Sequence, residues 1–126
     1  MPNPNPQRGE IYWIDVPRRH TVGSEQYKRR PWLVVSTNAI GYLPIVIGVP
    51  LSFEVQKKNR TFRIAILATD IILEPGATLD PGELVALTEQ VRVLSTERME
   101  FPRQGRITET ALYAVEAGLA YVLDIQ

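Results

Sequence analysis

The sequence predicts an α+β protein, mainly β, that folds as a small, strongly twisted antiparallel barrel with a C-terminal helix. Short apolar runs separated by turn residues over most of the chain indicate several strands. After Thr108 the apolar residues instead recur at spacings of three and four, which is typical of an amphipathic helix. The chain has 126 residues, of which 44% are hydrophobic, and this size fits a single core.

The N-terminal half of the chain is predicted to hold a tail, three strands and one long loop. Residues 1–7 are rich in proline and asparagine, so we expect a disordered tail ahead of a single domain at 8–126. Pro17 ends the first strand, and Pro31, which has no N–H group, suits the entry to the second. Between these prolines a polar loop spans residues 18–30. The three strands are predicted at residues 10–16, 32–36 and 45–52.

The C-terminal half is predicted to hold three more β-type runs, a helical turn and the final helix. A charged hairpin tip at 54–60 leads into these runs, which lie at residues 61–68, 83–87 and 90–94. The last two runs either join near Thr88-Glu89 or form one continuous strand. Residues 95–99 are predicted to form a single helical turn capped by Ser95. The apolar face of the final helix consists of Leu112, Val115, Leu119 and Val122.

The composition narrows the classes of function. Cysteine is absent, which excludes disulfides, a thiol nucleophile and a thiolate metal site. His20 is the single histidine and no carboxylate spacing suggests a ligand set, so we expect neither a metal nor a cofactor. No apolar run approaches the ~20 residues of a membrane helix. The N-terminus lacks the basic and apolar regions of a signal peptide, so we expect a cytoplasmic protein without membrane association.

The charges are balanced overall but separated along the chain. A formal net charge of zero argues against a generic nucleic-acid binder. Residues 18–30 nevertheless carry a local charge of +4, whereas residues 64–91 carry −5 and no cation. Separated charges of this kind create a local field that can hold an anionic partner. Solvated loops whose charges happen to segregate would give the same pattern.

Five short motifs follow one another in a recognisable order. They are "RGEIYWIDV", "GSEQ" at 23–26, "RRP" at 29–31, "VPLS" at 49–52 and "LTEQVRVL" at 87–94. In this order they resemble the MazF/PemK/Kid family of toxin endoribonucleases from bacterial type II toxin–antitoxin modules. The resemblance runs from about Arg8 through the C-terminal helix. It implies an SH3-like β-barrel of the MazF/CcdB/Kid type that forms a homodimer, binds an acidic MazE-like antitoxin, and binds DNA as the antitoxin complex.

The resemblance also implies which residues act on RNA. Arg30, which precedes the proline, takes the catalytic role, and Ser52 stands where the family has its catalytic threonine. Glu25 is a further possible catalytic residue, although it would serve equally to neutralise the arginine-rich loop. Gln90 maps to the glutamine at the RNA groove of relatives, or has a purely structural role. The other residues expected to contact RNA are His20, Ser24, Gln26, Tyr27, Lys28, Arg29 and Phe53.

These residue types suit RNA cleavage without a metal. The 2′-hydroxyl of RNA can attack the neighbouring phosphate, which leaves a 2′,3′-cyclic phosphate and a 5′-hydroxyl. Arg30 can donate two parallel N–H bonds to that phosphate, and the strand behind Pro31 holds the guanidinium still. Ser52 can donate a further hydrogen bond. The general base stays open between Glu25 and His20, and a solvated loop imidazole is the simpler interpretation of His20.

The aromatic residues divide into two groups. Trp13 and Trp32 lie in strand patterns and are expected in the core. Tyr27 and Phe53 flank the catalytic motifs and are better candidates for stacking on bases.

The predicted function is therefore a toxin that cleaves single-stranded mRNA with sequence selectivity and arrests translation and growth. The alternative is a non-enzymatic CcdB-like toxin that binds and poisons a protein target such as DNA gyrase through its C-terminal helix. Such a binder would need neither Arg30 nor Ser52. A third possibility is a degenerate toxin whose activity is weakened by serine at position 52.

Overall fold

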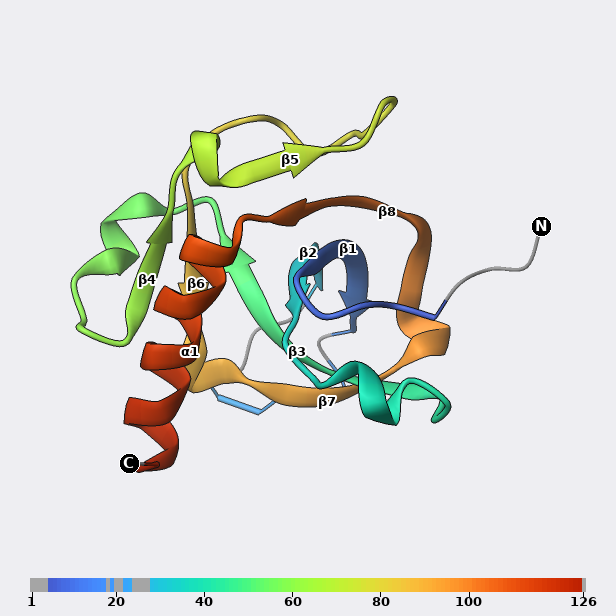
Figure 1. The fold of residues 1–126 in the computed structure, drawn as a ribbon, viewed down its shortest axis with the longest axis horizontal. Coiled ribbons are helices and arrows are strands. Elements are labelled where there is room, and N and C mark those ends of the chain that lie inside the picture. The colour runs from blue at the N-terminus through green and yellow to red at the C-terminus, as the bar shows by residue number, and fades with distance from the viewer. Residues whose placement is uncertain (1–4, 18, 20–21, 24–27, 126) are drawn as a thin grey trace.

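The computed structural model describes residues 5–17, 19, 22–23 and 28–125 of the chain. Within these residues, eight strands form one antiparallel sheet that curls into a half-barrel, with one α-helix beside it (Figure 1). This confirms the predicted fold class. The strands are β1 (Glu10–Val16), β2 (Lys28–Val34), β3 (Ile45–Ser52), β4 (Arg63–Ile66), β5 (Ile71–Leu73), β6 (Leu84–Leu87), β7 (Arg92–Ser95) and β8 (Met99–Ile107), and the helix is α1 (Glu109–Leu123).

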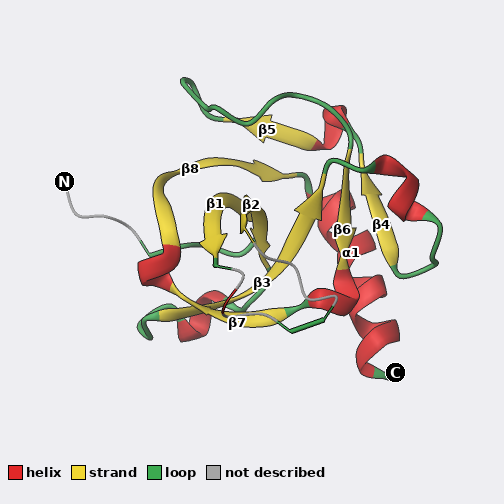
Figure 2. Ribbon diagram, turned by 180° about the vertical axis from the view of Figure 1, so that it is seen from behind, coloured by secondary structure: helices red, strands yellow, loops and turns green. Residues whose placement is uncertain are grey.

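The central strand of the sheet is β3, because it pairs with three neighbours. The strand order is β4-β6-β3-β2-β1-β8-β5, and β7 also pairs with β3. The first half of β3 pairs with β7, from Ile45 to Gly48, and its end pairs with β6 at Leu51 and Ser52. Its middle pairs with β2 on the other edge. The sheet therefore has to coil around β3, as Figures 1 and 2 show.

Strand alternation divides the buried side chains into two clusters. In β1, Ile11 belongs to one cluster, whereas Tyr12, Ile14 and Val16 belong to the other, because successive side chains of a strand point to opposite faces. Helix α1 covers the first cluster and lies beside β4 and β6 (Figures 1 and 2). The first cluster also contains Leu33, Val49 and Leu51, and the second contains Trp32, Val34, Val46, Leu94 and Met99.

Helix α1 begins and packs close to the prediction. The Thr108 side chain accepts a hydrogen bond from the N–H of Ala111 at 3.3 Å and so caps the first turn. The fully buried residues are Ala111, Val115 and Gly118. Three members of the predicted apolar face, Leu112, Leu119 and Val122, are half-buried at its margins. The buried face is therefore centred on smaller residues than the sequence indicated, which lets the helix approach the sheet closely.

The 3₁₀ turns resolve the alternatives around the C-terminal strands. A turn over Thr88–Gln90 separates β6 from β7, so these runs join at Thr88-Glu89 and are not one strand. Ser95 caps the next turn, Thr96–Arg98, by accepting the N–H of Glu97 at 3.1 Å, as predicted. The other 3₁₀ turns are Asn38–Ile40, Val55–Lys58 and Ala68–Asp70.

Two strands were missing from the prediction. Strand β8 pairs with both β1 and β5, but its register shifts between the partners of Ile11 and Trp13. It also contains Pro102 and several exposed residues, so no apolar alternation marks it. Strand β5 has only three residues, which is too short for a periodic signal.

The second strand begins earlier than predicted. Lys28, Arg29 and Arg30 belong to β2, where the sequence indicated the end of the loop 18–30. They pair with Val16, Asp15 and Ile14 of β1. The sequence did not indicate this start of the strand, because the prediction relied on apolar residues and these three are charged.

Part of the predicted tail makes contacts. The N–H of Gln7 donates to Glu10 Oε1 at 2.7 Å, and the Gln7 side chain donates to the Asn5 carbonyl at 3.0 Å. Asn5 to Gln7 therefore differ from the prediction of a tail that cannot pack. Among the described residues, no helix is long and apolar enough to span a membrane.

The predicted acidic stretch at 64–91 is largely neutralised in the fold. Three of its carboxylates form ion pairs with basic residues from other parts of the chain. The pairs are Glu74–Arg103 at 2.8 Å, Glu83–Lys58 at 2.9 Å and Glu89–Arg63 at 2.9 Å. The charge separation read from the sequence therefore overstates the field of this side of the molecule.

Gly105 offers a test of the β5–β8 pairing. A Cβ atom at this position would lie 2.4 Å from the backbone oxygen of Ile72 in β5. We expect Gly105→Ala to destabilise the protein by about 1–3 kcal/mol, because β5 has to move away from β8. Gly82→Ala is the matched control, since nothing lies within 4 Å of its Cβ position. Equal melting temperatures for the two variants would contradict this packing.

Candidate functional site

A fork between β2 and β3 opens one end of the sheet. The ladder between these strands ends at the pair Trp32–Pro50. Both Pro31 and Pro50 lack an N–H group, so neither can donate to a continued ladder. Beyond this point β2 continues only beside β1, whereas β3 turns toward β6 and pairs Ser52 with Val85. The two strands therefore diverge and leave an opening between them.

The opening is a cavity of about 390 Å³ that gathers the expected catalytic residues. Arg30 comes two residues before the last paired residue of β2, Trp32, and Ser52 two residues after its partner in β3, Pro50, so the two residues lie on either side of the opening. Both residues lie on the face of the sheet that carries Trp32 and the second core cluster. The residues that line the cavity are Lys28, Arg29, Arg30, Ser52, Phe53 and Glu54.

Ser52 forms the floor of this cavity. Its residue is only 1% exposed although it lines the opening. Its Oγ accepts the N–H of Glu54 at 3.1 Å, which fixes the side chain and leaves the hydroxyl proton available as a donor. A hydroxyl so deeply placed can reach only a group that enters the cavity.

Glu54 is a site residue that the sequence reading assigned to a hairpin tip. Its carboxylate pairs with Lys57 Nζ at 2.9 Å. The hydrogen bond and charge of Lys57 lower the pKa of Glu54, and the charges of Arg30 and Lys28 lower it further. The carboxylate therefore faces the basic wall of the cavity in its ionised form. Its position two residues after Ser52 was the one signal in the sequence that could have indicated it.

Arg29 points to the opposite face of β2 from Arg30 and is held in place there. Its Nε and Nη2 atoms donate to the two carboxylate oxygens of Glu100 at 2.7 and 2.9 Å. Its guanidinium also lies 4.2 Å from the ring centroid of Trp13. The hydrogen bonds that Arg29 donates to Glu100 raise the pKa of Arg29. Arg29 thus has a structural role at the rim of the cavity.

Trp13 and Trp32 have different environments. Trp32 is 1% exposed and lies in the second core cluster, as predicted. Trp13 is half-buried, and its Nε1 donates to Thr78 Oγ1 at 2.9 Å while Arg29 covers its ring. Trp13 therefore supports the rim of the site as well as the core.

The remaining expected site residues lie elsewhere or outside the description. Gln90 ends the 3₁₀ turn Thr88–Gln90, whereas the sequence predicted it as the first residue of the β-type run 90–94, and it is not among the residues that line the cavity. Phe53 lines the cavity and is 52% exposed, which suits a stacking surface. The residues His20, Ser24, Glu25, Gln26 and Tyr27 lie outside the described residues.

The described residues do not fit a metal ion. In ranges 5–17, 19, 22–23 and 28–125, no group of three or more His, Asp or Glu side chains is placed to hold one.

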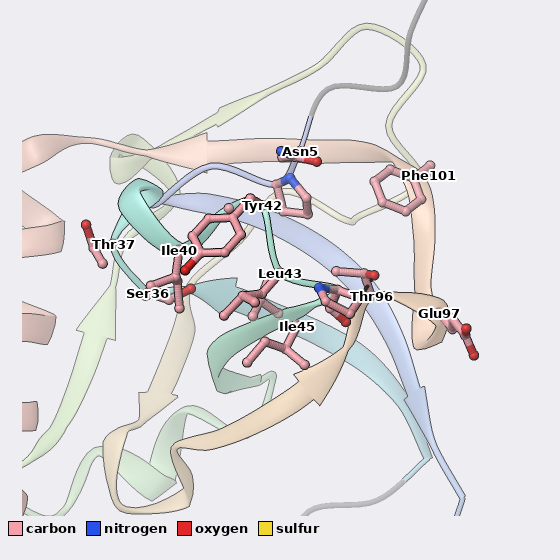
Figure 3. Close-up of a pocket in the computed structure, with 14 residues that line it drawn as sticks. Asn5, Ser36, Thr37, Ile40, Tyr42, Leu43, Ile45, Thr96, Glu97 and Phe101 are labelled. Atoms are coloured by element: carbon pink, nitrogen blue, oxygen red, sulfur yellow. Dashed lines mark hydrogen bonds between the residues drawn. The ribbon is translucent and has the colours of Figure 1, made fainter.

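A second cavity, of about 340 Å³, lies at the other end of β3 (Figure 3). Its wall includes Tyr42 and Leu43 from the segment before β3 and Phe101 from β8. None of the residues expected to contact RNA lines it, and its one carboxylate is Glu97. Arg30, Ser52 and Phe53, which the sequence predicted to act on RNA, all line the β2–β3 cavity, and we assign this cavity as the candidate site.

Solved structures that are similar to this fold include MazF toxins. MazF from Deinococcus radiodurans superposes with a TM-score of 0.71 at 22% identity, over 94% of this chain and 96% of that chain. A mycobacterial endoribonuclease in complex with its cognate antitoxin gives a TM-score of 0.65 at 21% identity, over 97% and 96%. The Mycobacterium tuberculosis toxin MazF-mt6 gives 0.68 at 13% identity, over 93% and 98%. The class that the fold defines is therefore the MazF-type toxin fold.

The sequence comparison then identifies the family. The family model described as PemK-like, MazF-like toxin of type II toxin-antitoxin system matches residues 7–123. The chain belongs to this toxin family, which confirms the resemblance carried by the five motifs. Among curated proteins, no significant match was found.

The Arg29–Glu100 pair predicts a pH-dependent contribution to stability. Arg29 lowers the pKa of Glu100 in the folded protein. The stabilisation is therefore present above the pKa of an unfolded carboxyl and is lost as the pH falls through the lowered pKa of Glu100. The two side chains are 49% and 44% exposed, so we expect Glu100→Gln to cost at most about 1 kcal/mol at pH 7 and nothing in strong acid.

Thermal unfolding at neutral and acidic pH checks this expectation. Glu97→Gln is the matched control, because it removes the same charge from an exposed position in the preceding turn. A loss for Glu100→Gln that equals the control, or that persists unchanged in acid, would show that the pair does not stabilise the fold.

Proposed function

We propose that this toxin-family protein is a metal-independent endoribonuclease that cleaves single-stranded mRNA in the cytoplasm and so arrests translation and growth. The observation that carries the proposal is that Arg30 of β2 and Ser52 of β3 line the same cavity at the fork between these strands. An arginine and a serine hydroxyl that line one small cavity suit a phosphodiester group. The mycobacterial and deinococcal structures support the same class of activity, since one is named an endoribonuclease.

Arg30 supplies the main electrostatic stabilisation of the charge that develops on the phosphate during cleavage. As an arginine it can donate two parallel N–H bonds to the phosphate oxygens that gain charge during attack by the 2′-hydroxyl. Its backbone is part of β2 and pairs with Ile14, so its position is set before RNA binds. The hydroxyl of Ser52 donates to the same phosphate from the floor of the cavity.

The shape of the site favours an unpaired strand. Phe53, at the rim, offers an exposed ring on which a base can stack once it is free of a duplex. The adjacent side chain of Lys28 is exposed and adds positive charge for the RNA backbone. Sequence selectivity then depends on the rim residues, whereas the chemistry depends on Arg30 and Ser52.

The protein is proposed to act as a homodimer that an acidic antitoxin of the MazE class inhibits. Apolar side chains remain exposed on β7 and at the end of α1, which supports a second copy there. They are Val93 at 53%, Tyr121 at 66% and Leu123 at 54% exposure. Related structures include a MazE–MazF complex from Deinococcus radiodurans. An acidic segment can occupy the basic rim at Lys28 and exclude RNA.

Substitutions at the two facing residues test the proposed activity. The purified protein should cleave an unstructured RNA in EDTA and leave 2′,3′-cyclic phosphate ends. Arg30→Ala and Arg30→Lys should each lose at least about 10²-fold in rate, since lysine cannot make the paired N–H contacts. Ser52→Ala should lose activity, whereas Ser52→Thr should keep or raise it because the hydroxyl stays. Mass spectrometry of the products and single-turnover rates check these outcomes.

Two results would reject the proposal. One is strict dependence of cleavage on an added divalent metal. The other is an intact pool of RNA after brief expression of the protein in cells whose growth has stopped, which points to a protein target instead.

Charge reversal at Lys28 tests whether RNA and the antitoxin bind the same basic rim of the cavity. Lys28→Glu should weaken both RNA cleavage and binding of the acidic antitoxin, most steeply at low salt. Arg29 is unsuitable for this test, because its reversal also breaks the pair with Glu100. Arg106→Glu, at an exposed position on β8, is the control of equal charge. If antitoxin affinity stays unchanged while cleavage falls, the antitoxin acts from another surface.

A further inference from the structure

Glu54 occupies an unusual place for an acidic residue. It lines a cavity whose β2 wall carries Lys28 and Arg30, with Arg29 at the rim, in a site proposed to receive phosphate. A carboxylate there repels the phosphate and so weakens RNA binding. A function of the carboxylate in the reaction would offset this unfavourable interaction. Its backbone N–H donates to Ser52 Oγ at 3.1 Å, which ties its position to that of the hydroxyl on the floor.

We propose that Glu54 is the proton acceptor that activates the 2′-hydroxyl of the bound RNA. This inference rests on the proposed endoribonuclease function and deepens it. The observation that carries it is the convergence of Glu54, Ser52 and Arg30 in the β2–β3 cavity.

The step balances without any further reactant. The 2′-O–H proton moves to a carboxylate oxygen of Glu54, and the electron pair of the 2′-oxygen forms a bond to phosphorus. The bond from phosphorus to the 5′-oxygen breaks, and that oxygen leaves with the electron pair and takes a proton from water. Glu54 then returns its proton to solvent. Arg30 stabilises the charge on the phosphate throughout.

The charged groups around Glu54 keep its carboxylate in the ionised form that a proton acceptor needs. On its own side, Lys57 in the turn Val55–Lys58 pairs with it at 2.9 Å. On β2, Arg30 and Lys28 add positive charge. All three lower the pKa of Glu54, with Lys57 first, so the carboxylate is ionised at neutral pH.

Other carboxylates near the fork are engaged differently. Glu100 forms a two-point contact with Arg29 on the opposite face of β2. Glu89 accepts from Arg63 Nε at 2.9 Å, away from the residues that line the cavity. Within the described part of the chain, Glu54 is the carboxylate that lines this cavity.

The test measures single-turnover cleavage of one unstructured RNA in EDTA from about pH 3 to pH 8, because the lowered pKa of Glu54 puts its protonation below the usual range of a carboxyl. The general base must be deprotonated, so the wild-type rate should fall in acid as Glu54 takes up a proton. Glu54→Gln should lower the rate by about 10²–10⁴-fold. It should also abolish the fall of the rate in acid, which is the acidic limb of the pH–rate profile. Glu54 is exposed, and its side chain is 56% accessible, so the fold should tolerate the change.

Neighbouring lysines provide a matched pair of variants. Lys57→Met removes the group that most lowers the pKa of Glu54, so the acidic limb should move to higher pH. Lys58→Met removes an equal charge from the same turn, but Lys58 pairs with Glu83 at 2.9 Å, so the limb should stay in place. A limb that moves equally in both variants would overturn the assignment.

Binding of an uncleavable 2′-O-methyl copy of the RNA separates catalysis from recognition. Glu54→Gln should bind this probe at least as tightly as wild type, because a charge that repels phosphate is gone. Weaker binding by Glu54→Gln, or a reduced rate that keeps the acidic limb, would overturn the proposal. Wild-type protein that cleaves no RNA would reject the endoribonuclease function itself, whereas active wild type with an equally active Glu54→Gln rejects only the role of Glu54.

Discussion

The fold depends on one strand, β3, which forms hydrogen-bonded ladders with three other strands. Strand β3 pairs with β7 along its first half, with β6 at its end and with β2 along its middle. One edge cannot serve both β6 and β7 without an offset, and the 3₁₀ turn Thr88–Gln90 takes up the extra residues between them. Because β3 leaves β2 to follow β6, the sheet opens where Pro31 and Pro50 end the shared ladder. The candidate site is thus a product of how the backbone pairs.

Local patterns predicted the elements that alternate cleanly and failed where the backbone is irregular. The alternation of β1 and the apolar run of β3 gave correct bounds, and the start of α1 followed from Thr108. Strand β8 was missed because its register shifts along β1 and because most of its first half is exposed. Strand β8 forms because it pairs with β1 and β5, which lie elsewhere in the sequence. The pattern of its own nine residues does not contain that information.

The site shows the same division between local and distant information. The sequence presents Lys28, Arg29 and Arg30 as one basic cluster, and the family resemblance singled out Arg30 and Ser52. The pairing of the strands then separates neighbours: Arg30 faces the cavity, whereas Arg29 is held by Glu100 and Trp13 on the other face. Glu100 is far from Arg29 in the chain, so this difference could not be read from the sequence. Glu54 was overlooked because a charged residue after a strand looks like an ordinary turn.

The fork also places the two walls of the cavity on separate parts of the sheet. The wall of β2 is backed by β1 and β8, whereas the wall of Ser52 and Glu54 is backed by β6 and β4. Changes in the segment after β3 can therefore accumulate without disturbing the scaffold that carries Arg30. The two walls therefore have separate structural supports, so a local change in the packing behind one wall leaves the backbone of the other in place, even though the proposed chemistry needs side chains from both.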